Sequence, residues 1–334
     1  MPRITSLTRL ASILDPFLLM LVGVMLLATV LPARGVWSDV VAWLANAGIV
    51  LLFFLHGARL SRKAILGALG NGRLHLAVLL TTFLVFPLVG LALAKLPMVP
   101  AQIATGLLFT ALLPSTVQSS IAFTSIAGGN VAAAVCSASL SNLVGVFATP
   151  LLVALLMRTG GTAGVSMESV KTLVLLLLLP FVVGHLLRPW IGAFISRNSA
   201  WLGKVDRGSI LMVVYAAFGA AVVGGLWDAL TWRDLAWILG LSTVLLVVML
   251  SLTWFGARRL GMPREDAIVL LFCGSKKSLA TGVPMAGVLF PAAIIGPILL
   301  PLMIFHQIQL MACAVIARRI ARAADISGQE PAVR

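Results

Sequence analysis

Two adjacent lysines, Lys276 and Lys277, occupy the position in this chain that most needs a chemical explanation. They lie with Ser275 and Ser278 between two apolar runs, within the segment 270–285. In lipid, each lysine costs about 2.5 to 3.5 kcal/mol on insertion scales, so a cavity or a partner is expected around the pair. Glycines and a proline in this segment loosen the helix, and a broken helix that carries charge at mid-depth is typical of a transport site.

The lysine pair is open to several interpretations. An ammonium group can attract an anionic substrate, or it can stand permanently where a related protein would hold a metal cation. It can also be a structural charge that pairs with the carbonyls of a broken helix, and a deeply buried amine can exchange a proton and carry protons. Because adjacent residues on a helix lie about 100° apart, we expect one lysine to line the site while the other reaches elsewhere.

A second polar cluster follows Pro114 and contains the hydroxyl and amide side chains of Thr116, Gln118, Ser119, Ser120 and Thr124. A proline removes one backbone donor and frees a carbonyl one turn earlier. Hydroxyl and amide groups beside a freed carbonyl form an oxygen-rich site for a small cation or for the polar groups of a substrate. A single serine or threonine often only packs membrane helices together, but the cluster as a whole favours a binding site.

Two other apolar segments carry polar side chains at mid-span, and these complete the set of candidates. The segment 131–157 carries Ser137, Ser139, Ser141 and Asn142, and the segment 293–317 carries His306, Gln307 and Gln309. The candidates among them are Ser139, Asn142, His306 and Gln307. Sodium and proton carriers commonly hold a carboxylate at mid-membrane, but all ten carboxylates of this chain fall at predicted helix ends or in loops. The sequence contains no HExxH, GxSxG or Walker motif, so neither an enzyme nor an ATP-driven pump is expected.

Composition defines the class of protein. Of the 334 residues, 60% are hydrophobic and 10% are charged, whereas a soluble protein carries about 25% charged residues. The net charge of +14 comes from basic residues in short gaps between apolar runs, so no nucleic-acid partner is expected. Cys136, Cys273 and Cys313 each lie alone in an apolar run and are expected to be packing residues. The composition therefore predicts a polytopic membrane protein in contact with lipid.

A membrane span needs about 20 mostly apolar residues, and this criterion predicts ten helices. The expected ranges are 11–32, 37–57, 74–95, 100–126, 131–157, 168–188, 206–227, 233–256, 265–290 and 293–317. The first run mimics a signal peptide, but Asp15 and Pro16 interrupt its start, so we expect a retained helix. The short connections leave no room for a separate domain.

Basic residues predict the orientation of these helices. Of 24 lysines and arginines, 17 collect on one side and five on the other, and the lysine pair makes up the remaining two. Because cytoplasmic loops retain basic residues, both termini are expected in the cytoplasm and the protein in the cell (inner) membrane. The segment 159–168 is the expected extracellular link, 189–204 an interfacial amphipathic piece, and the tail after Arg322 an unordered end.

Ten helices divide into two sets of five, and an odd number in each half makes any repeat inverted. The breaks at 113–120 and 274–278 are matching landmarks, since each is followed by a helix with polar residues at mid-span. The expected fold is therefore all-α, with two inverted five-helix repeats. The first repeat is predicted at 1–158, the second at 159–320, and a short cytoplasmic tail at 321–334.

The runs 113–132 and 272–278 resemble the bile acid:sodium symporter superfamily, and they look closest to the branch that contains the seventh member of solute carrier family 10 and its bacterial relatives. The resemblance covers essentially the whole chain. It implies a panel domain of helices 1, 2, 6 and 7 and a core domain of helices 3 to 5 and 8 to 10. It also implies that helices 4 and 9 cross at unwound middles, with two sodium ions behind the crossing in sodium-coupled members.

The resemblance places the family's sodium-binding residues of helix 4 near Ser119 and Ser120, which would be metal ligands only if sodium binds. A helix 3 glutamine of the family falls near Thr82. The family's helix 9 glutamate falls at Phe272 and a nearby glutamine at Lys276. Losing a carboxylate and gaining an ammonium removes the electrostatic reason for sodium to bind. We therefore hypothesise that a lysine occupies a sodium position, so that transport is uncoupled from sodium or coupled to protons.

The resulting expectation is a secondary transporter that moves a small organic anion by alternating access, without a cofactor and with weakened or absent sodium coupling. The family name favours a sterol-like or bile-acid-like substrate by analogy; the sequence leaves the oligomeric state open. One alternative is a non-transporting membrane protein that regulates channels or carriers by association. A membrane-embedded enzyme is a third class, disfavoured by the missing carboxylates and nucleophile motifs.

Overall fold

The structure is a computed structural model that describes residues 16–59, 68–157, 172 and 174–326. The regular elements in these residues are all helical. Within the described ranges, seven helices are long and apolar enough to cross a membrane. They are Val36–Arg59, Gly72–Ala94, Val131–Leu156, Val174–Arg197, Ser199–Val223, Trp232–Arg259 and Ile294–Ala323. The predicted class, an all-α polytopic membrane protein, is confirmed.

The elements follow one another along the chain with short connections. The first part contains α2 (Pro16–Val30), α3 (Val36–Arg59), η1 (Ala68–Asn71), α5 (Gly72–Leu80), η2 (Thr81–Val85), α6 (Phe86–Ala94), α7 (Ala101–Leu112), α8 (Gln118–Ile126) and α9 (Val131–Leu156). The second part contains η3 (Val174–Leu178), α11 (Leu179–Arg197), α12 (Ser199–Val223), α13 (Leu226–Ala229), α14 (Trp232–Arg259), α15 (Arg264–Gly274), α16 (Leu279–Leu289) and α17 (Ala292–Ile326).

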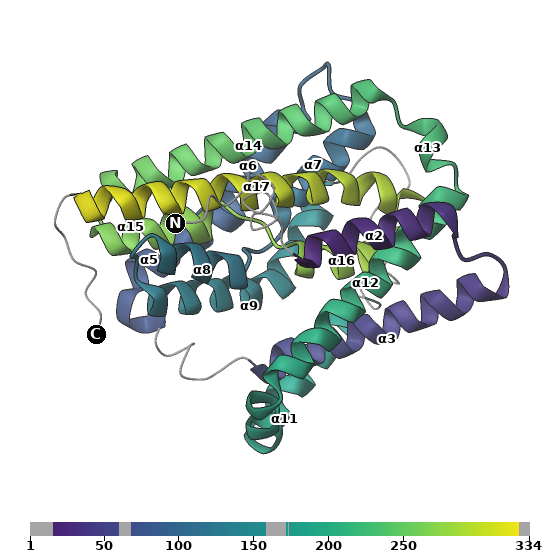
Figure 1. Ribbon diagram of the computed structural model, residues 1–334, viewed down its shortest axis with the longest axis horizontal. Helices are drawn as coiled ribbons and strands as arrows, with labels where there is room; N and C mark the ends of the chain where they lie inside the picture. Colours follow the sequence, from purple (N-terminus) through teal and green to yellow (C-terminus); the bar gives the residue numbers. More distant parts are fainter. Residues whose placement is uncertain (1–15, 60–67, 158–171, 173, 327–334) are drawn as a thin grey trace, which may run out of the picture.

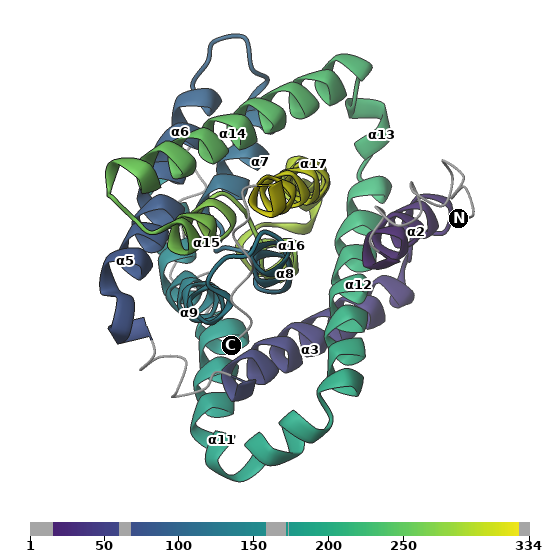
Figure 2. The same cartoon turned by 60° about the vertical axis from the view of Figure 1, so that its left-hand side comes forward.

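These helices pack into two bundles (Figures 1 and 2). The panel bundle consists of α2, α3, α11 and α12, in which α3 contacts both α11 and α12. The core bundle consists of the helices from α5 to α9 and from α14 to α17. Helix α12 makes the largest contact between the bundles, against α16 and α17. This grouping is the one that the family resemblance implies for the panel and core domains.

Two glycines allow α3 and α11 of the panel bundle to touch through their backbones. A Cβ atom added at Gly57 would lie 1.9 Å from the carbonyl oxygen of Phe181. A Cβ atom added at Gly184 would lie 2.1 Å from the carbonyl oxygen of Phe54. Small residues at a crossing let membrane helices approach closely and gain van der Waals contact. The two positions are reciprocal, so the contact fixes the register of both helices.

One carboxylate ties three helices together at an end of the core bundle. Asn71 and Asn130 accept hydrogen bonds at Oδ1 from the backbone N–H of Leu74 (3.4 Å) and Ala133 (3.0 Å), which caps α5 and α9. Their side-chain Nδ2 groups donate to Asp266 in the first turn of α15, at 2.6 and 3.1 Å. Each amide therefore caps its own helix with its oxygen and binds α15 with its nitrogen.

Some predicted boundaries are corrected. Helix α11 continues through Pro189 to Arg197 and α12 begins at Ser199, so 189–204 is not a separate interfacial element. Apolar runs end where charged residues appear, but a helix continues beyond the hydrocarbon layer as long as its backbone bonds are made. For the same reason α17 extends to Ile326, past the predicted helix end at 317.

Asp206 is a further correction, because it lies inside α12 and forms an ion pair with Arg59 of α3 instead of standing at a helix end. The predicted boundary between the second repeat and the tail, at 321, falls within α17. Three predictions lie outside the described residues: the start of the first helix at 11–15, the link at 159–168, and the tail from 327 onward.

We predict that Gly57→Ala and Gly184→Ala each lower the free energy of unfolding by about 1 to 3 kcal/mol, because the new methyl group forces α3 and α11 apart. The measurement is thermal unfolding of the purified protein in detergent. Gly240→Ala in α14 is the matched control, since an added Cβ there has nothing within 4 Å and alanine favours the helix. Unchanged stability in both panel variants would contradict the close contact.

Candidate functional site

Two unwound segments cross at the centre of the core bundle. Helix α7 ends before 113–117 and α8 follows, and α15 ends before 275–278 and α16 follows. The backbone N–H of Ser278 donates to the carbonyl of Pro114 at 2.9 Å. We call these two segments and the side chains that bond to them the crossover. Unpaired backbone groups at membrane depth need partners within the protein or water, and the crossover supplies such partners.

Lys277 provides two of these backbone partners. Its Nζ donates to the carbonyl oxygen of Leu113 at 2.6 Å and to that of Thr82 at 2.8 Å. Leu113 O lies at the end of α7, where a helix leaves its last carbonyls without an N–H donor. The amine also lies 4.1 Å from the ring centroid of Phe86, a favourable position for a cation. Lys277 therefore connects α5–α6 to the break between α7 and α8.

The free carbonyl of Thr82 has its origin in Pro87. In the π turn η2, the N–H of Phe86 bonds the carbonyl of Thr81 instead of the carbonyl of Thr82. The next residue, Pro87, has no N–H to offer. The local sequence thus leaves one buried carbonyl without a helical donor, and Lys277 fills that position from a segment almost 200 residues away.

Lys276 has a different environment. Its Nζ donates to Ser119 Oγ at 3.3 Å and lies 4.5 Å from the ring centroid of Phe123 and 5.7 Å from that of Phe272. Both lysine residues are 0% exposed, and within the described part of the chain neither forms an ion pair with a carboxylate. The two side chains therefore bond different groups, but both groups belong to the crossover, and the lysines leave an unwound segment and not a helix.

A chain of hydroxyl groups continues from Ser119 of α8. Ser119 Oγ donates to Thr116 Oγ1 at 2.8 Å, and Thr116 Oγ1 shares a hydrogen bond of 2.9 Å with Ser120 Oγ. Ser120 Oγ in turn donates to the carbonyl of Phe272 at 3.1 Å. The hydroxyl chain therefore links the start of α8 to the end of α15 beside Lys276.

Two amide side chains bond the unwound backbone. In α9, Asn142 Nδ2 donates to Ser115 O at 2.9 Å, and its Oδ1 accepts from Thr281 Oγ1 of α16 at 2.9 Å. In α17, Gln309 accepts from the N–H of Lys277 at 2.9 Å and donates to its carbonyl at 2.8 Å. Each break is thus held by an amide from the second helix after it in the chain.

The structure brings most of the predicted site residues into the crossover. Those that contact it are Thr82, Thr116, Ser119, Ser120, Asn142, Lys276, Lys277 and Ser278. Thr82 contributes its carbonyl and not its hydroxyl. Ser275 lies in the second unwound segment and donates to the carbonyl of Leu271 in α15, and His306 accepts from Gln309 Nε2 at 2.8 Å.

Three predicted residues do not make these contacts. Gln118 is exposed at the start of α8, and Ser139 is half-buried on α9. Gln307 Oε1 is buried without a hydrogen-bond partner among the described residues. Gln309, which bonds both backbone groups of Lys277, was not among the candidates predicted from the sequence. Its polarity at mid-span was a visible signal, but the sequence did not distinguish it from its neighbours on the same helix.

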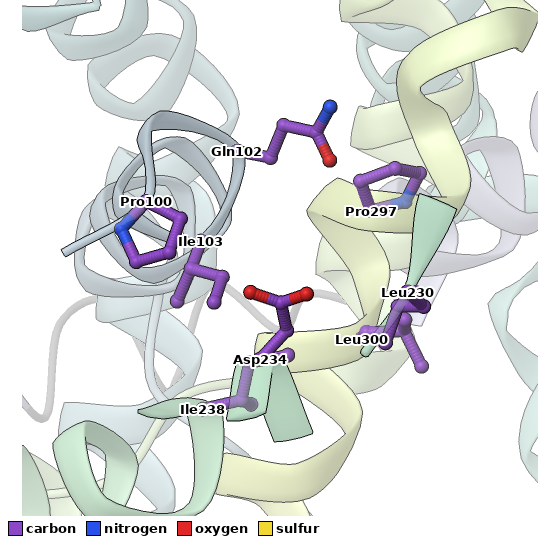
Figure 3. Close-up of a pocket in the computed structure, with 8 residues that line it drawn as sticks. All are labelled: Pro100, Gln102, Ile103, Leu230, Asp234, Ile238, Pro297 and Leu300. Atoms are coloured by element: carbon purple, nitrogen blue, oxygen red, sulfur yellow. The ribbon is translucent and has the colours of Figure 1, made fainter. Parts of the chain in front are cut away.

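A pocket away from the crossover lies between the start of α7, the start of α14 and α17 (Figure 3). Its lining residues are Pro100, Gln102, Ile103, Leu230, Asp234, Ile238, Pro297 and Leu300. The Asp234 carboxylate accepts from the backbone N–H of Thr231 at 2.9 Å and from its hydroxyl at 2.7 Å. It therefore completes the capping box of α14, and the pocket is not part of the candidate site.

The fold and the crossover define a class of protein: a polytopic membrane protein whose two broken helices meet at a buried polar centre. The model of the SBF-like CPA transporter family matches residues 15–322. The chain belongs to this family, within the bile acid:sodium symporter superfamily, which confirms the resemblance found in the sequence.

Three relatives illustrate the range of similarity. "Putative symporter YfeH" of Escherichia coli (strain K12) is 54% identical over 316 residues, which cover 94% of this chain and 95% of the relative. "Uncharacterized protein PA2026" of Pseudomonas aeruginosa is 54% identical over 313 residues, which cover 93% and 94%. "Sodium/bile acid cotransporter 7" of Mus musculus is 27% identical over 278 residues, 81% of each chain. The family makes this chain a membrane transporter of a small-molecule substrate.

We predict that Lys277→Met lowers the free energy of unfolding by about 2 kcal/mol more than Lys276→Met, because it leaves two buried carbonyls without a donor. Lys276→Met removes only one long hydrogen bond and two ring contacts. The measurement is the thermal unfolding midpoint of each variant in detergent, with the exposed Lys95→Met as the control. An equal or larger loss in the Lys276 variant would show that the carbonyls do not depend on Lys277.

Proposed function

We propose that this protein is a secondary active transporter that moves a small organic anion by alternating access, with weakened or absent sodium coupling. The observation that carries the proposal is the buried Lys277 amine, which bonds the carbonyls of Thr82 and Leu113 at the crossover. A permanently attached cation takes the place that a bound ion would otherwise fill. The alternative, a non-transporting regulator, is not favoured by the family.

The proposed membrane topology has ten crossings arranged as two inverted five-helix repeats. Beside the seven long helices, α2, the pair α7–α8 and the pair α15–α16 would each cross once. The repeat is supported by the matching bonds of the two amides: Asn142 holds the break that precedes α9, and Gln309 holds the break that precedes α17. Because the arginine-rich helix ends lie on one side, both termini are proposed in the cytoplasm and the protein in the cell (inner) membrane.

An anionic substrate is supported by the charge of the site. Lys276 and Lys277 are not paired with a carboxylate within the described ranges. The first turns of α8 and α16 also start at the crossover, and helix N-termini carry partial positive charge. Lys276, the hydroxyls of Ser119 and Thr116, and the exposed Gln118 are the proposed substrate contacts. A sterol-like or bile-acid-like anion is the proposed class by analogy with the relatives' names.

Weak sodium coupling is supported by where the amines lie. The resemblance maps sodium ligands of the family to Thr82, Ser119 and Ser120, and the two amines contact Thr82 and Ser119. An ammonium within a few ångströms of a cation repels it strongly in a low-dielectric interior. If sodium does bind, Ser119 and Ser120 are its proposed ligands, and no other cofactor is proposed.

Movement of the core bundle against the panel bundle is supported by the apolar packing. Two apolar clusters contain residues of both bundles. The first includes Ile49 and Val213 of the panel and Val283 of the core, and the second includes Phe218 of the panel and Leu245 of the core. At the end of the protein that carries Arg59, Arg258 and Arg259, the described residues form separate clusters. One lies around Leu55 in the panel, and two lie around Leu74 and around Ile268 in the core. We propose that this arrangement is the inward-facing state.

The coupling proposal is tested with protein in liposomes. We expect saturable uptake of an anion such as taurocholate that does not change when external sodium is replaced by N-methylglucamine, because a lysine amine takes the position of the ion. Lys276→Ala should lower uptake at least tenfold, whereas the exposed Lys95→Ala should not. Uptake that requires sodium, with the same affinity in Lys276→Ala and Lys277→Ala, would refute the proposal.

The movement proposal is tested with a disulfide across the first of these shared clusters. A Cβ added at Gly287 lies 3.6 Å from Val213 Cγ1, which is within reach of a disulfide after small adjustments. In a variant without Cys136, Cys273 and Cys313, we expect Val213→Cys with Gly287→Cys to lose uptake on oxidation and regain it on reduction. Each single variant is a control, and full uptake by the oxidised pair would contradict a movement of the two bundles.

A further inference from the structure

An arginine patch covers one end of the core bundle, where α14 and α17 end and α15 begins (Figure 1). Its residues are Arg258, Arg259, Arg264, Arg318, Arg319 and Arg322, and all six are exposed. None of them takes part in the crossover. The proposed topology uses these arginines only to mark the cytoplasmic side, and the proposed transport mechanism does not use them.

The three helix ends are held together by direct contacts. Arg264 Nη2 donates to the carbonyl of Ile320 at 3.4 Å, which joins the start of α15 to the end of α17. Trp254 of α14 packs against the cluster that contains Ala317. The guanidinium of Arg258 lies 4.7 Å from the ring centroid of Trp254. The patch is thus a built surface and not a set of independent loops.

Among the described residues, no carboxylate forms an ion pair with the patch, and the exposed Glu265 next to Arg264 is far outnumbered by the six arginines. Over the described ranges, the one ion pair joins Arg59 to Asp206 in the panel bundle. Asp266, in the first turn of α15, already accepts hydrogen bonds from Asn71 and Asn130. Six guanidinium groups at neighbouring helix ends raise the local positive potential and attract an external anion.

The depth of the patch matches the headgroup layer of a membrane. Helix α14 has 28 residues and is therefore about 42 Å long, whereas the hydrocarbon core of a bilayer is about 30 Å thick. Arg258 and Arg259 stand in the last turn of this helix. Leu252 and Phe255, which lie nearer the middle of the same helix, are exposed apolar residues.

Helix α17 repeats this order of residues. Met311 and Val315 are exposed apolar side chains, and the exposed Arg319 follows Val315 by four residues. Residues four apart share a helix face, so an apolar surface leads directly to a basic surface. The same relation holds on α14 between Phe255 and Arg259.

We propose that the arginine patch binds the headgroup of an anionic phospholipid, with the acyl chains against the exposed apolar residues of α14 and α17. Guanidinium groups bind phosphate oxygens in a bidentate manner, and basic surfaces between membrane helices suit lipids such as cardiolipin. The apolar surface beneath the arginines favours a lipid over a soluble anion. The proposal does not depend on the transported substrate.

The test is native mass spectrometry of the purified full-length protein in detergent, with added cardiolipin, phosphatidylglycerol or phosphatidylcholine. The patch variant combines Arg259→Gln, Arg318→Gln and Arg322→Gln. The control variant removes the same amount of charge from the panel bundle through Arg188→Gln, Arg197→Gln and Lys204→Gln. We expect the wild type and the control to retain cardiolipin, and the patch variant to bind it at least tenfold more weakly.

A second variant separates the positive charge of the arginines from their bidentate hydrogen bonding. Replacing Arg259, Arg318 and Arg322 by lysine keeps the charge but removes the bidentate geometry, so we expect weaker binding than in the wild type and tighter binding than in the glutamine variant. Thermal unfolding midpoints of all variants verify the fold. Equal retention of cardiolipin by the glutamine variant, an equal loss in the panel control, or equally strong retention of phosphatidylcholine would overturn the proposal.

Discussion

The centre of this protein depends on the two hydrogen bonds that the side-chain nitrogen of Lys277 donates. It bonds carbonyls of two different helical elements, Thr82 O at 2.8 Å and Leu113 O at 2.6 Å. A buried charge is costly unless it is hydrogen-bonded, and a buried carbonyl is costly unless it has a donor. The carbonyls provide hydrogen-bond acceptors for the amine, and the amine provides donors for the carbonyls. These hydrogen bonds therefore stabilise the unwound crossing of the helices inside the membrane.

In the rest of the crossover, side-chain and backbone groups also form hydrogen bonds with the unwound backbone. Asn142 of α9 and Gln309 of α17 bond the backbone of the two breaks. The N–H of Ser278 bonds the carbonyl of Pro114 across the crossing. Hydrogen bonds in a low-dielectric interior are strong, so these contacts between the breaks and their neighbouring helices favour movement of the core bundle as a unit. The panel bundle reaches rigidity by another route, the backbone contact at Gly57 and Gly184.

The sequence left several interpretations of the lysine pair open, and the two lysines match different ones. Lys277 matches the interpretation of a structural charge that pairs with broken-helix carbonyls, and its position also fits a built-in substitute for a metal ion. Lys276 has a single long hydrogen bond to Ser119, which leaves more of its bonding capacity for a ligand. This asymmetry is why the proposed substrate contact is Lys276.

The sequence alone determined the class of protein, the family, the positions of both breaks and most residues of the crossover. These depend on local properties: the length of apolar runs, the prolines and glycines that interrupt them, and the high cost of lysine in lipid. It did not determine that Thr82 acts through its carbonyl, that Gln309 and not Gln307 bonds the break, or that α11 and α17 continue beyond their apolar runs. Those outcomes depend on the π turn before Pro87, on the rotation of helices about their axes and on contacts between distant segments. Only the tertiary structure decides them, because a break removes the fixed angle between successive residues that makes a helix face readable from sequence.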